Sequence, residues 1–372
     1  MEKVKFKEIF SFEKKSKIKA GDGFKLGEGK YPFYTSSDTL SKTLNEFLFE
    51  DESLIFGTGG LASIHHCYEK FAVSTDCFVT QAKNDKETFT KFVYYYLSGN
   101  MHLLENGFKG AGLKHISKGY IEDLEIPLPP VPTQQKIAAI LDKADELRQY
   151  NKQLIEKYDA LTQSLFLEMF GDPVRNEKGW KKLELKKFGK IITGNTPPRN
   201  DDENYSSNFI EWLKTDNIND KYVNVTQAKE YLSEKGFSKA RFVENGALLV
   251  ACIAGSIESI GRASLTDRKV SFNQQINAIQ PFDDVNPKYL YNLFKISKKH
   301  IQNHASNGMK RMLTKGEFEK ILMIKPTLEL QNQFAEQVQL IETQKQQAQE
   351  TLAKSEDLFQ GLLQRAFKGE LN

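Results

Sequence analysis

A glycine-rich string, Gly57-Thr-Gly-Gly60, follows the apolar run Ser53-Leu-Ile-Phe56 and could form a phosphate cradle. Nucleotide-binding loops of this kind also carry a lysine and a hydroxyl, or a second glycine pair at dinucleotide spacing, and this string has neither. A turn at the end of a strand, where glycine accepts a positive φ, is the interpretation that we favour.

The same string, read from Phe56, comes close to the glycine motif of adenine methyltransferases. That class of enzyme also needs an Asn/Asp-Pro-Pro-aromatic loop to hold the target base. The nearest strings are Tyr31-Pro-Phe-Tyr34 and Thr196-Pro-Pro-Arg199, and neither contains the Asn or Asp that would accept a hydrogen bond from the base. The sequence therefore does not predict a methyltransferase.

Zinc-ligand residue types gather at His65-His66-Cys67 and Cys77, but their spacing matches no structural zinc pattern. A polar cluster on a strand is the alternative that we prefer. Acidic strings of the nuclease type arise by chance in a chain with 27% charged residues, and none lies on a clear pair of predicted strands. We expect no metal, no cofactor and no catalytic activity.

Length and composition are those of a globular protein with two ordinary domains: 372 residues, 39% of them hydrophobic. There is no run of about 18 apolar residues and no apolar core of a signal peptide. The cysteines Cys67, Cys77 and Cys252 are odd in number and lack CxxC spacing, which fits a reducing compartment. We expect a cytoplasmic protein that has no contact with membranes.

The net charge of +3 is unevenly distributed. Residues 171–325 contain 26 Lys and Arg against 18 Asp and Glu, whereas the remaining segments are slightly acidic. Such an excess is the electrostatic signature of a polyanionic partner, although a solvated lysine-rich surface explains the charge equally well.

The chain is an internal repeat with an offset of 197 residues. Residues 126–170 align without gaps on residues 323–367 with nine identities in 45 positions, where composition alone gives about two or three. The same offset pairs Ile116-Ser-Lys-Gly119 with Leu313-Thr-Lys-Gly316, and Val73-Ser74 with Val270-Ser271. The identities are Pro129/Pro326, Gln134/Gln331, Ala138/Ala335, Gln149/Gln346, Lys157/Lys354, Leu161/Leu358, Gln163/Gln360, Leu165/Leu362 and Phe170/Phe367.

Each copy ends in a hinge and a long helix. The four prolines of Ile126-Pro-Leu-Pro-Pro-Val-Pro-Thr133 exclude helix, so we expect the first helix to begin at Gln134. Residues 134–170 contain no Pro or Gly and are stopped by Gly171-Asp-Pro173, which predicts a helix of about 37 residues and about 55 Å.

Both predicted helices carry apolar residues at the alternating spacing of a coiled-coil seam. We expect the two helices to pack as an antiparallel pair, the alternative being that each stripe faces its own globular module. In the first helix the seam is Ile140, Ala144, Leu147, Leu154, Tyr158, Leu161 and Leu165, with Asn151 as a polar interruption. In the second it is Phe334, Val338, Ile341, Ala348, Leu352, Phe359 and Leu362, with Lys345 and Ser355 as polar members.

The modules mix short apolar runs, such as Ala247-Leu-Leu-Val-Ala251, with aromatic stretches, such as Phe92-Val-Tyr-Tyr-Tyr-Leu97, and with many Gly and Asn turns. The fold class that we predict is two α/β or α+β modules in tandem, separated by two long helices that form an antiparallel coiled coil.

This layout resembles the specificity subunits of type I restriction-modification systems over the whole chain. The second hinge, Ile324-Lys-Pro-Thr-Leu-Glu-Leu330, is poorer in proline than the family pattern, and the first module has no Gly-x-Thr-Pro string. The matching features are the first hinge with its helix start, Lys118-Gly119 and Lys315-Gly316, Gln134 and Gln331, Gly171-Asp-Pro173, Trp180-Lys-Lys-Leu183, and Thr193-Gly-Asn-Thr-Pro-Pro198.

By this resemblance, residues 1–127 and 172–325 are target recognition domains, and residues 128–171 and 326–372 are hinges with spacer helices. Each domain would read one half of an asymmetric split site in double-stranded DNA. The paired helices would set the gap and dock two methyltransferase subunits, and it stays open whether restriction subunits join. The chain itself would be non-catalytic.

Candidate DNA contacts combine basic or amide side chains with glycine-containing loops, although a solvated loop residue is an equal alternative for each one. In the first module these are Lys109, Lys114 and His115. In the second they are Arg199, Lys214, Arg262, Asn273, Gln274, Gln275, Asn307, Lys310 and Arg311.

Two other classes compete with this interpretation. One is a scaffold whose two modules bind proteins, against which the basic segment argues mildly. The other is a stand-alone methyltransferase or nuclease, against which the missing base-holding loop argues.

Overall fold

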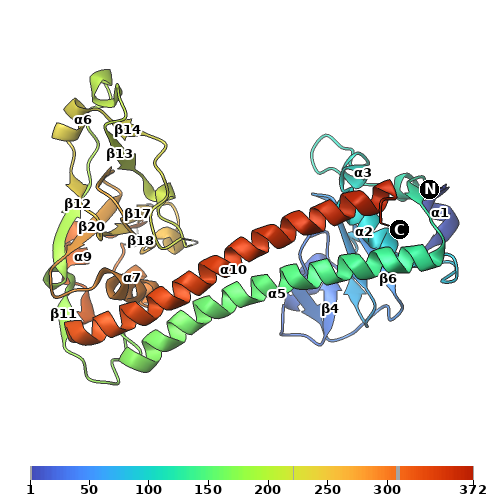
Figure 1. Ribbon diagram of the computed structural model, residues 1–372, viewed down its shortest axis with the longest axis horizontal. Helices are drawn as coiled ribbons and strands as arrows, with labels where there is room; N and C mark the ends of the chain where they lie inside the picture. Colours follow the sequence, from blue (N-terminus) through green and yellow to red (C-terminus); the bar gives the residue numbers. More distant parts are fainter. Residues whose placement is uncertain (1, 221, 307–310, 372) are drawn as a thin grey trace. The chain divides into compact units, whose positions relative to one another are not determined.

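The computed structural model describes residues 2–220, 222–306 and 311–371. The chain divides into two compact units, one formed by Met1–Gln153 with Gln349–Asn372 and the other by Leu154–Ala348. Each unit contains one mixed α/β module and part of each long helix (Figure 1).

The module of the first unit is built from two four-stranded sheets, ordered β2-β9-β6-β7 and β3-β5-β4-β8, and a ladder β1-β10. Strands β4 and β8 pair in parallel, and the other pairs are antiparallel. Its elements are β1 (Lys3–Lys5), α1 (Phe6–Ile9), β2 (Phe10–Phe12), η1 (Ala20–Asp22), β3 (Phe24–Lys25), β4 (Tyr31–Tyr34), β5 (Lys42–Leu44), β6 (Ser53–Gly57), β7 (Ser63–Cys67), β8 (Ala72–Val73), β9 (Cys77–Ala82), α2 (Thr90–Gly99), α3 (His102–Glu105), α4 (Lys118–Glu122) and β10 (Glu125–Pro127).

The module of the second unit repeats this plan with sheets β12-β20-β16-β18 and β14-β13-β19-β15 and ladders β11-β22 and β17-β21. Here β13 and β19 form the parallel pair. Its elements are β11 (Lys182–Glu184), η2 (Leu185–Lys187), β12 (Gly189–Thr193), η3 (Asp202–Tyr205), β13 (Ile210–Leu213), η4 (Thr215–Asn217), β14 (Tyr231–Leu232), α6 (Glu234–Ser238), β15 (Phe242–Val243), β16 (Leu248–Ala251), β17 (Ile253–Ala254), η5 (Ile257–Ser259), β18 (Ala263–Leu265), β19 (Val270–Phe272), β20 (Ile276–Pro281), α7 (Pro287–Ile296), α8 (Lys298–Gln302), β21 (Arg311–Met312), α9 (Lys315–Lys320) and β22 (Leu322–Ile324).

The sequence repeat is a structural repeat. Helix α7 covers the residues of α2 at an offset of 197, and β22 covers those of β10 at the same offset. The turn predicted at Gly57-Thr-Gly-Gly60 follows the fully buried strand β6, and Gly60 has a φ of +85°. The mixed fold class and the duplication are therefore confirmed.

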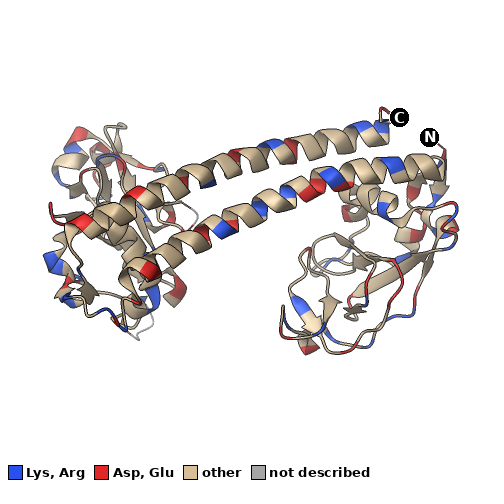
Figure 2. Cartoon of the chain, turned by 60° about the horizontal axis from the view of Figure 1, so that its bottom comes forward, with Lys and Arg blue, Asp and Glu red and all other residues tan. Residues whose placement is uncertain are grey.

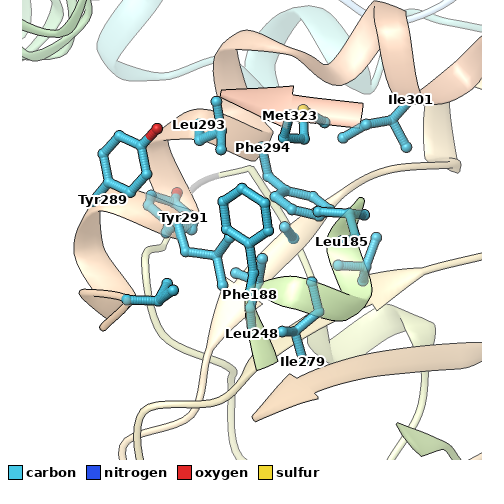
Figure 3. Packing of buried hydrophobic residues seen from close by; sticks show 14 of the residues in the cluster. Leu185, Phe188, Leu248, Ile279, Tyr289, Tyr291, Leu293, Phe294, Ile301 and Met323 are labelled. Atoms are coloured by element: carbon cyan, nitrogen blue, oxygen red, sulfur yellow. The ribbon is translucent and has the colours of Figure 1, made fainter. Parts of the chain in front are cut away.

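The core of the second module joins the sheet to α7 and β22 (Figure 3). Phe188, Tyr289 and Phe294 are fully buried there beside Met323. Burial of each such side chain stabilises the fold by about 1.5–3 kcal/mol. Phe170, at the end of the first long helix, lies in the same cluster and contacts the ring of Tyr289. The helix end is thus a part of this core.

The first long helix, α5, spans Val131–Phe170 and has 40 residues. The predicted start at Gln134 is wrong by one turn, because the helix includes Pro132. Proline fits the first turn of a helix, where its missing N–H has no intrahelical acceptor. The predicted stop is correct, since Gly171 has a φ of +74° and its N–H donates to the carbonyl of Leu167.

The second long helix, α10, spans Leu328–Lys368 and lies antiparallel to α5 within each unit (Figure 1). In the first unit Asn151 Nδ2 donates to Ser355 Oγ at 3.2 Å, and Lys152 pairs with Glu356. In the second unit Lys345 pairs with Asp159. The predicted antiparallel coiled coil is confirmed. Both long helices also pack on the modules. The alternative, in which each apolar stripe faces a module, therefore holds together with the helix pair.

The predicted seam holds for α10 and fails at two positions of α5. Leu147 and Leu161 are 42% and 49% exposed, so neither belongs to the buried seam. The half-buried Arg148 lies on the seam side instead, with its guanidinium 3.8 Å from the ring centroid of Phe359. A long polar side chain can fill a seam position with its apolar stem, which apolar spacing alone does not reveal. The buried or half-buried seam positions are Ile140, Ala144, Asn151, Leu154, Tyr158, Leu165, Phe334, Val338, Ile341, Lys345, Ala348, Leu352, Ser355, Phe359 and Leu362.

Within the described residues, no helix combines the length and the apolar character that crossing a bilayer requires.

Candidate nucleic-acid interface

Equivalent backbone hydrogen bonds close two short segments, called hairpins below: residues 109–115 in the first module and residues 306–312, of which 307–310 lie outside the described residues, in the second. In the first, the N–H of Lys109 donates to the carbonyl of His115 at 3.0 Å. In the second, the N–H of Ser306 donates to the carbonyl of Met312 at 2.9 Å. The two pairs are related by the offset of 197, so Arg311 occupies the place of Lys114. Structure and repeat agree that these are equivalent loops.

The base of each hairpin is attached to the segment that follows the central strand of the main sheet. In the first module the N–H of Ile116 donates to the carbonyl of Thr58 at 3.2 Å. In the second, Leu313 donates to Cys252 at 2.8 Å, and β21 pairs with β17. Because β6 and β16 are buried, both hairpins are held by the rigid part of the module.

In the first module the hairpin brings together Lys109, Lys114 and His115. The ring Nδ1 of His115 lies 3.1 Å from the carbonyl of Thr58, which orients this side chain. Gly110 has a φ of +146°, and a Cβ there would lie 2.8 Å from the carbonyl oxygen of Leu113, so only glycine fits. Within the described part of the chain, neither lysine forms an ion pair. Both lysines are exposed to solvent.

In the second module Asn307 and Lys310 lie outside the described residues. Arg311 lies on β21 and is half-buried. Hydrogen bonds from the Glu258 backbone and from Ser256, together with the nearby charges of Arg311 and Lys298, lower the pKa of Glu258. The guanidinium of Arg311 therefore lies in the field of at least one carboxylate.

Arg199 and Lys214 lie together but share one carboxylate. Arg199 donates to Glu230 at 2.7 Å, and Lys214 also contacts Glu230. The Lys214 hydrogen bond, followed by that of Arg199, lowers the pKa of Glu230. The Arg199 guanidinium also lies 4.4 Å and 4.8 Å from the ring centroids of Tyr205 and Trp212. This cluster offers less free positive charge than the sequence suggested.

The three amides of residues 273–275 form the turn between β19 and β20. Asn273 is buried, and its side chain bonds to Gln275 in both directions, at 2.9 Å and 3.1 Å. Gln274 contacts Thr196, so the Thr-Pro-Pro loop is tied to the same turn. These bonds give Asn273 a structural role in the turn, and this role does not require contact with DNA.

Backbone hydrogen bonds join the remaining candidates of the second module to one end of its main sheet. The carbonyl of Gln275 accepts from Cys252 and Ile253, at the start of β17. The carbonyl of Arg262 accepts from Ala251 at the end of β16. Arg262, Gln275 and the Arg311 hairpin are therefore neighbours.

Two buried glutamines, equivalent in the repeat, connect each hinge to its module. Gln134 accepts from the N–H of Phe89 at 2.8 Å and donates to the carbonyls of Glu87 at 2.9 Å and Pro129 at 2.7 Å. Gln331 makes the same three bonds, to Asn286, Asp284 and Pro326. The sequence marked both positions as identities, but it did not predict this structural role.

We expect Gln134→Ala to lower the free energy of unfolding of the full chain by about 2–4 kcal/mol, because buried groups left unpaired cost about 1–3 kcal/mol each. Urea denaturation measures this effect. Gln135→Ala, at the exposed neighbouring position, is the control and should change little. Equal stabilities of the two variants would show that the three bonds are not stabilising.

The histidines of the cluster that contains zinc-ligand residue types lie within hydrogen-bond distance of other groups of the chain. His65 Nε2 lies 2.8 Å from the carbonyl of Ser37, and His66 Nε2 lies 2.6 Å from Glu52. Cys67 and Cys77 are buried, and burial raises the pKa of the Cys77 thiol to about 11. As predicted, His65-His66-Cys67 lies on a strand, β7.

Comparison with known proteins identifies the class to which this architecture belongs. The family model described as type I restriction modification DNA specificity domain matches residues 1–158 and 177–352. The chain belongs to this family. Each of the two matched stretches contains one module of the structural repeat.

Two relatives and one solved structure illustrate the similarity. The HindI specificity subunit of Haemophilus influenzae is 30% identical over 158 residues, which are 41% of this chain and 33% of the relative. The MjaVIII specificity subunit of Methanocaldococcus jannaschii is 26% identical over 254 residues, 66% of this chain and 52% of the relative. The matched regions thus span a third and about half of these relatives' lengths.

The crystal structure of a type I restriction-modification S subunit from M. genitalium has the same fold. It matches with a TM-score of 0.63 and 16% identity, covering 98% of this chain and 95% of that one. The predicted resemblance to type I specificity subunits is confirmed.

Proposed function

We propose that this chain is the non-catalytic DNA-reading subunit of a type I restriction-modification complex and that each module reads one half of an asymmetric, bipartite site. Residues 1–127 and 172–325 are the two readers in this proposal. The observation that carries it is one backbone hydrogen bond, from Lys109 to His115 and from Ser306 to Met312, which recurs in both modules at an offset of 197 and places Lys114 and Arg311 at equivalent positions. Lys and Arg side chains are among the groups that contact DNA phosphates.

In this proposal residues 128–171 and 326–372 set the distance between the two half-sites. Two readers separated by a fixed spacer select half-sites at a fixed separation, as symmetric DNA-binding dimers do. Here the duplication supplies two copies of one module, and it leaves the two readers free to differ in sequence.

The helices also carry the surface that we propose for two methyltransferase subunits. Leu161 and Leu358 are identical in the two copies and are 49% and 51% exposed, so neither is needed for the seam. Leu147 is a further exposed apolar residue on α5. Lys and Arg are interspersed with Asp and Glu along both long helices (Figure 2). Two equivalent apolar positions suit two copies of one partner.

We expect one copy of the purified chain to bind two copies of a separately encoded adenine methyltransferase. Alone, the chain should have no methyl transfer or cleavage activity. The reason is that the chain has two equivalent docking positions and no base-holding loop. Mass photometry of the mixture and calorimetric titration of the chain with S-adenosylmethionine measure both points. Micromolar binding of S-adenosylmethionine by the isolated chain would contradict the proposal.

A further inference from the structure

Two leucines of the first module are exposed beside its hairpin cations. Leu61 and Leu113 are 81% and 76% exposed, and no large hydrophobic side chain among the described residues is more exposed. Neither belongs to a core cluster. Packing of this module therefore does not explain why these positions hold leucine.

The backbone brings both leucines to the same place. Gly59 forms a bridge with His115, and the N–H of Gly60 donates to the carbonyl of Lys114 at 3.3 Å. Leu61 and Leu113 are the next residues in this register. Two glycines with positive φ, Gly60 and Gly110, flank the arrangement, so the two turns present the leucines at the tip.

The surroundings of the two leucines favour a polyanion. Residues 53–68 and 106–121 contain no Asp or Glu, whereas Lys109 and Lys114 lie on the hairpin itself. A site that binds a protein with an acidic surface would carry a similar positive charge. However, the equivalent hairpin of the second module also carries a cation, Arg311. DNA is the partner that both modules share in the proposed function.

Apolar side chains read DNA in one simple way, by contact with the 5-methyl group of thymine in the major groove. We propose that Leu61 and Leu113 form an apolar reading tip that contacts thymine methyl groups in the half-site of the first module. This inference rests on the proposed function. At the offset of 197 the second module has Lys310 in place of Leu113, so the two half-sites are read by different chemistry.

The test begins with selection of binding sites from a random duplex pool by the full chain. Each thymine of the selected site is then replaced by uracil, which removes only the 5-methyl group. For the wild-type chain we expect one or two such replacements, confined to one half-site, to weaken binding about three- to fivefold, the effect of one buried methyl group.

Each of these replacements should lose its effect in Leu61→Ala or in Leu113→Ala, whichever removes the leucine that contacts that methyl group. The affinity of that variant for the thymine duplex should equal that of the wild type for the duplex with that uracil. Leu26→Ala is the matched control, because Leu26 is 59% exposed on another loop of the same unit. It should retain the full thymine preference. The leucines are exposed, so all three variants should keep the wild-type melting temperature.

An unchanged thymine preference in both leucine variants would overturn the inference, as would a selected site with no methyl-sensitive thymine. In either case a bipartite site selected by the wild-type chain leaves the proposed function intact. Selection of no site at all by the chain or by its methyltransferase complex would overturn both.

Discussion

Reversing the charge of the hairpin cations should weaken duplex binding about 10- to 100-fold per module at physiological salt, because removing a charge-assisted hydrogen bond costs about 1.5–3 kcal/mol. The variants are Lys109→Glu with Lys114→Glu in the first module and Lys310→Glu with Arg311→Glu in the second. The slope of log K against log salt should flatten by about 0.9 for each phosphate that the variant no longer neutralises. Fluorescence anisotropy at several salt concentrations measures both quantities.

Lys86→Glu is the control for these variants. Lys86 is exposed on the turn that precedes α2 and carries the same charge in the same module. It should alter neither affinity nor slope beyond the small effect of net charge. If the hairpin variants behave like this control, the DNA-binding surface lies elsewhere.

Lengthening both long helices by one heptad should move the two half-sites apart by up to about three base pairs, since seven helical residues add about 10 Å and a base pair occupies about 3.4 Å. The segment to duplicate in α5 is 154–160, which keeps the seam in phase. The bond between Asn151 and Ser355 and the ion pair between Asp159 and Lys345 place 346–352 opposite this segment in α10.

Duplicating only 154–160 is the informative comparison. With one helix lengthened, the readers can tilt, and the shift in the gap should be smaller than with both. The half-site sequences should be unchanged in both variants, because neither alters a module. A variant that folds and supports methylation only at the original gap would contradict the spacer role of the helices.

Much of this architecture could be predicted from the sequence, because the repeat is visible in the residues of the hinges and the long helices. The offset of 197 brought the two hinges, the two helices and the two hairpins into correspondence. The seam of α10 was correct because its polar members, Lys345 and Ser355, stand at regular spacing among apolar ones.

Other features could not be predicted, because a polar residue type can serve either in packing or in binding. Arg148 fills the seam beside Phe359 while Leu147 is exposed, so the apolar pattern predicted the wrong phase there. Asn273 was a candidate for reading bases, but its side chain stabilises a turn. Gln134 and Gln331 are fully buried, and each donates to a carbonyl that lies 47 residues away, which local sequence cannot show.

The two modules are separate folding units for a reason that these details show. Each module has its own sheets and its own core, and each core includes residues from a long helix. In the first unit, Phe359 and Leu363 of α10 are buried in the module core. A change in one helix end therefore affects the stability of one module first.

Mapping adenine methylation across the host genome, with this gene deleted and then restored, tests the central claim most directly. We predict one asymmetric motif of two short half-sites with a constant gap, methylated only when the gene is present. Restoring the gene with Lys109→Glu and Lys114→Glu should abolish or relax one half of that motif. Methylation that is unchanged by the deletion, or a gene-dependent motif without a gap, would contradict the account.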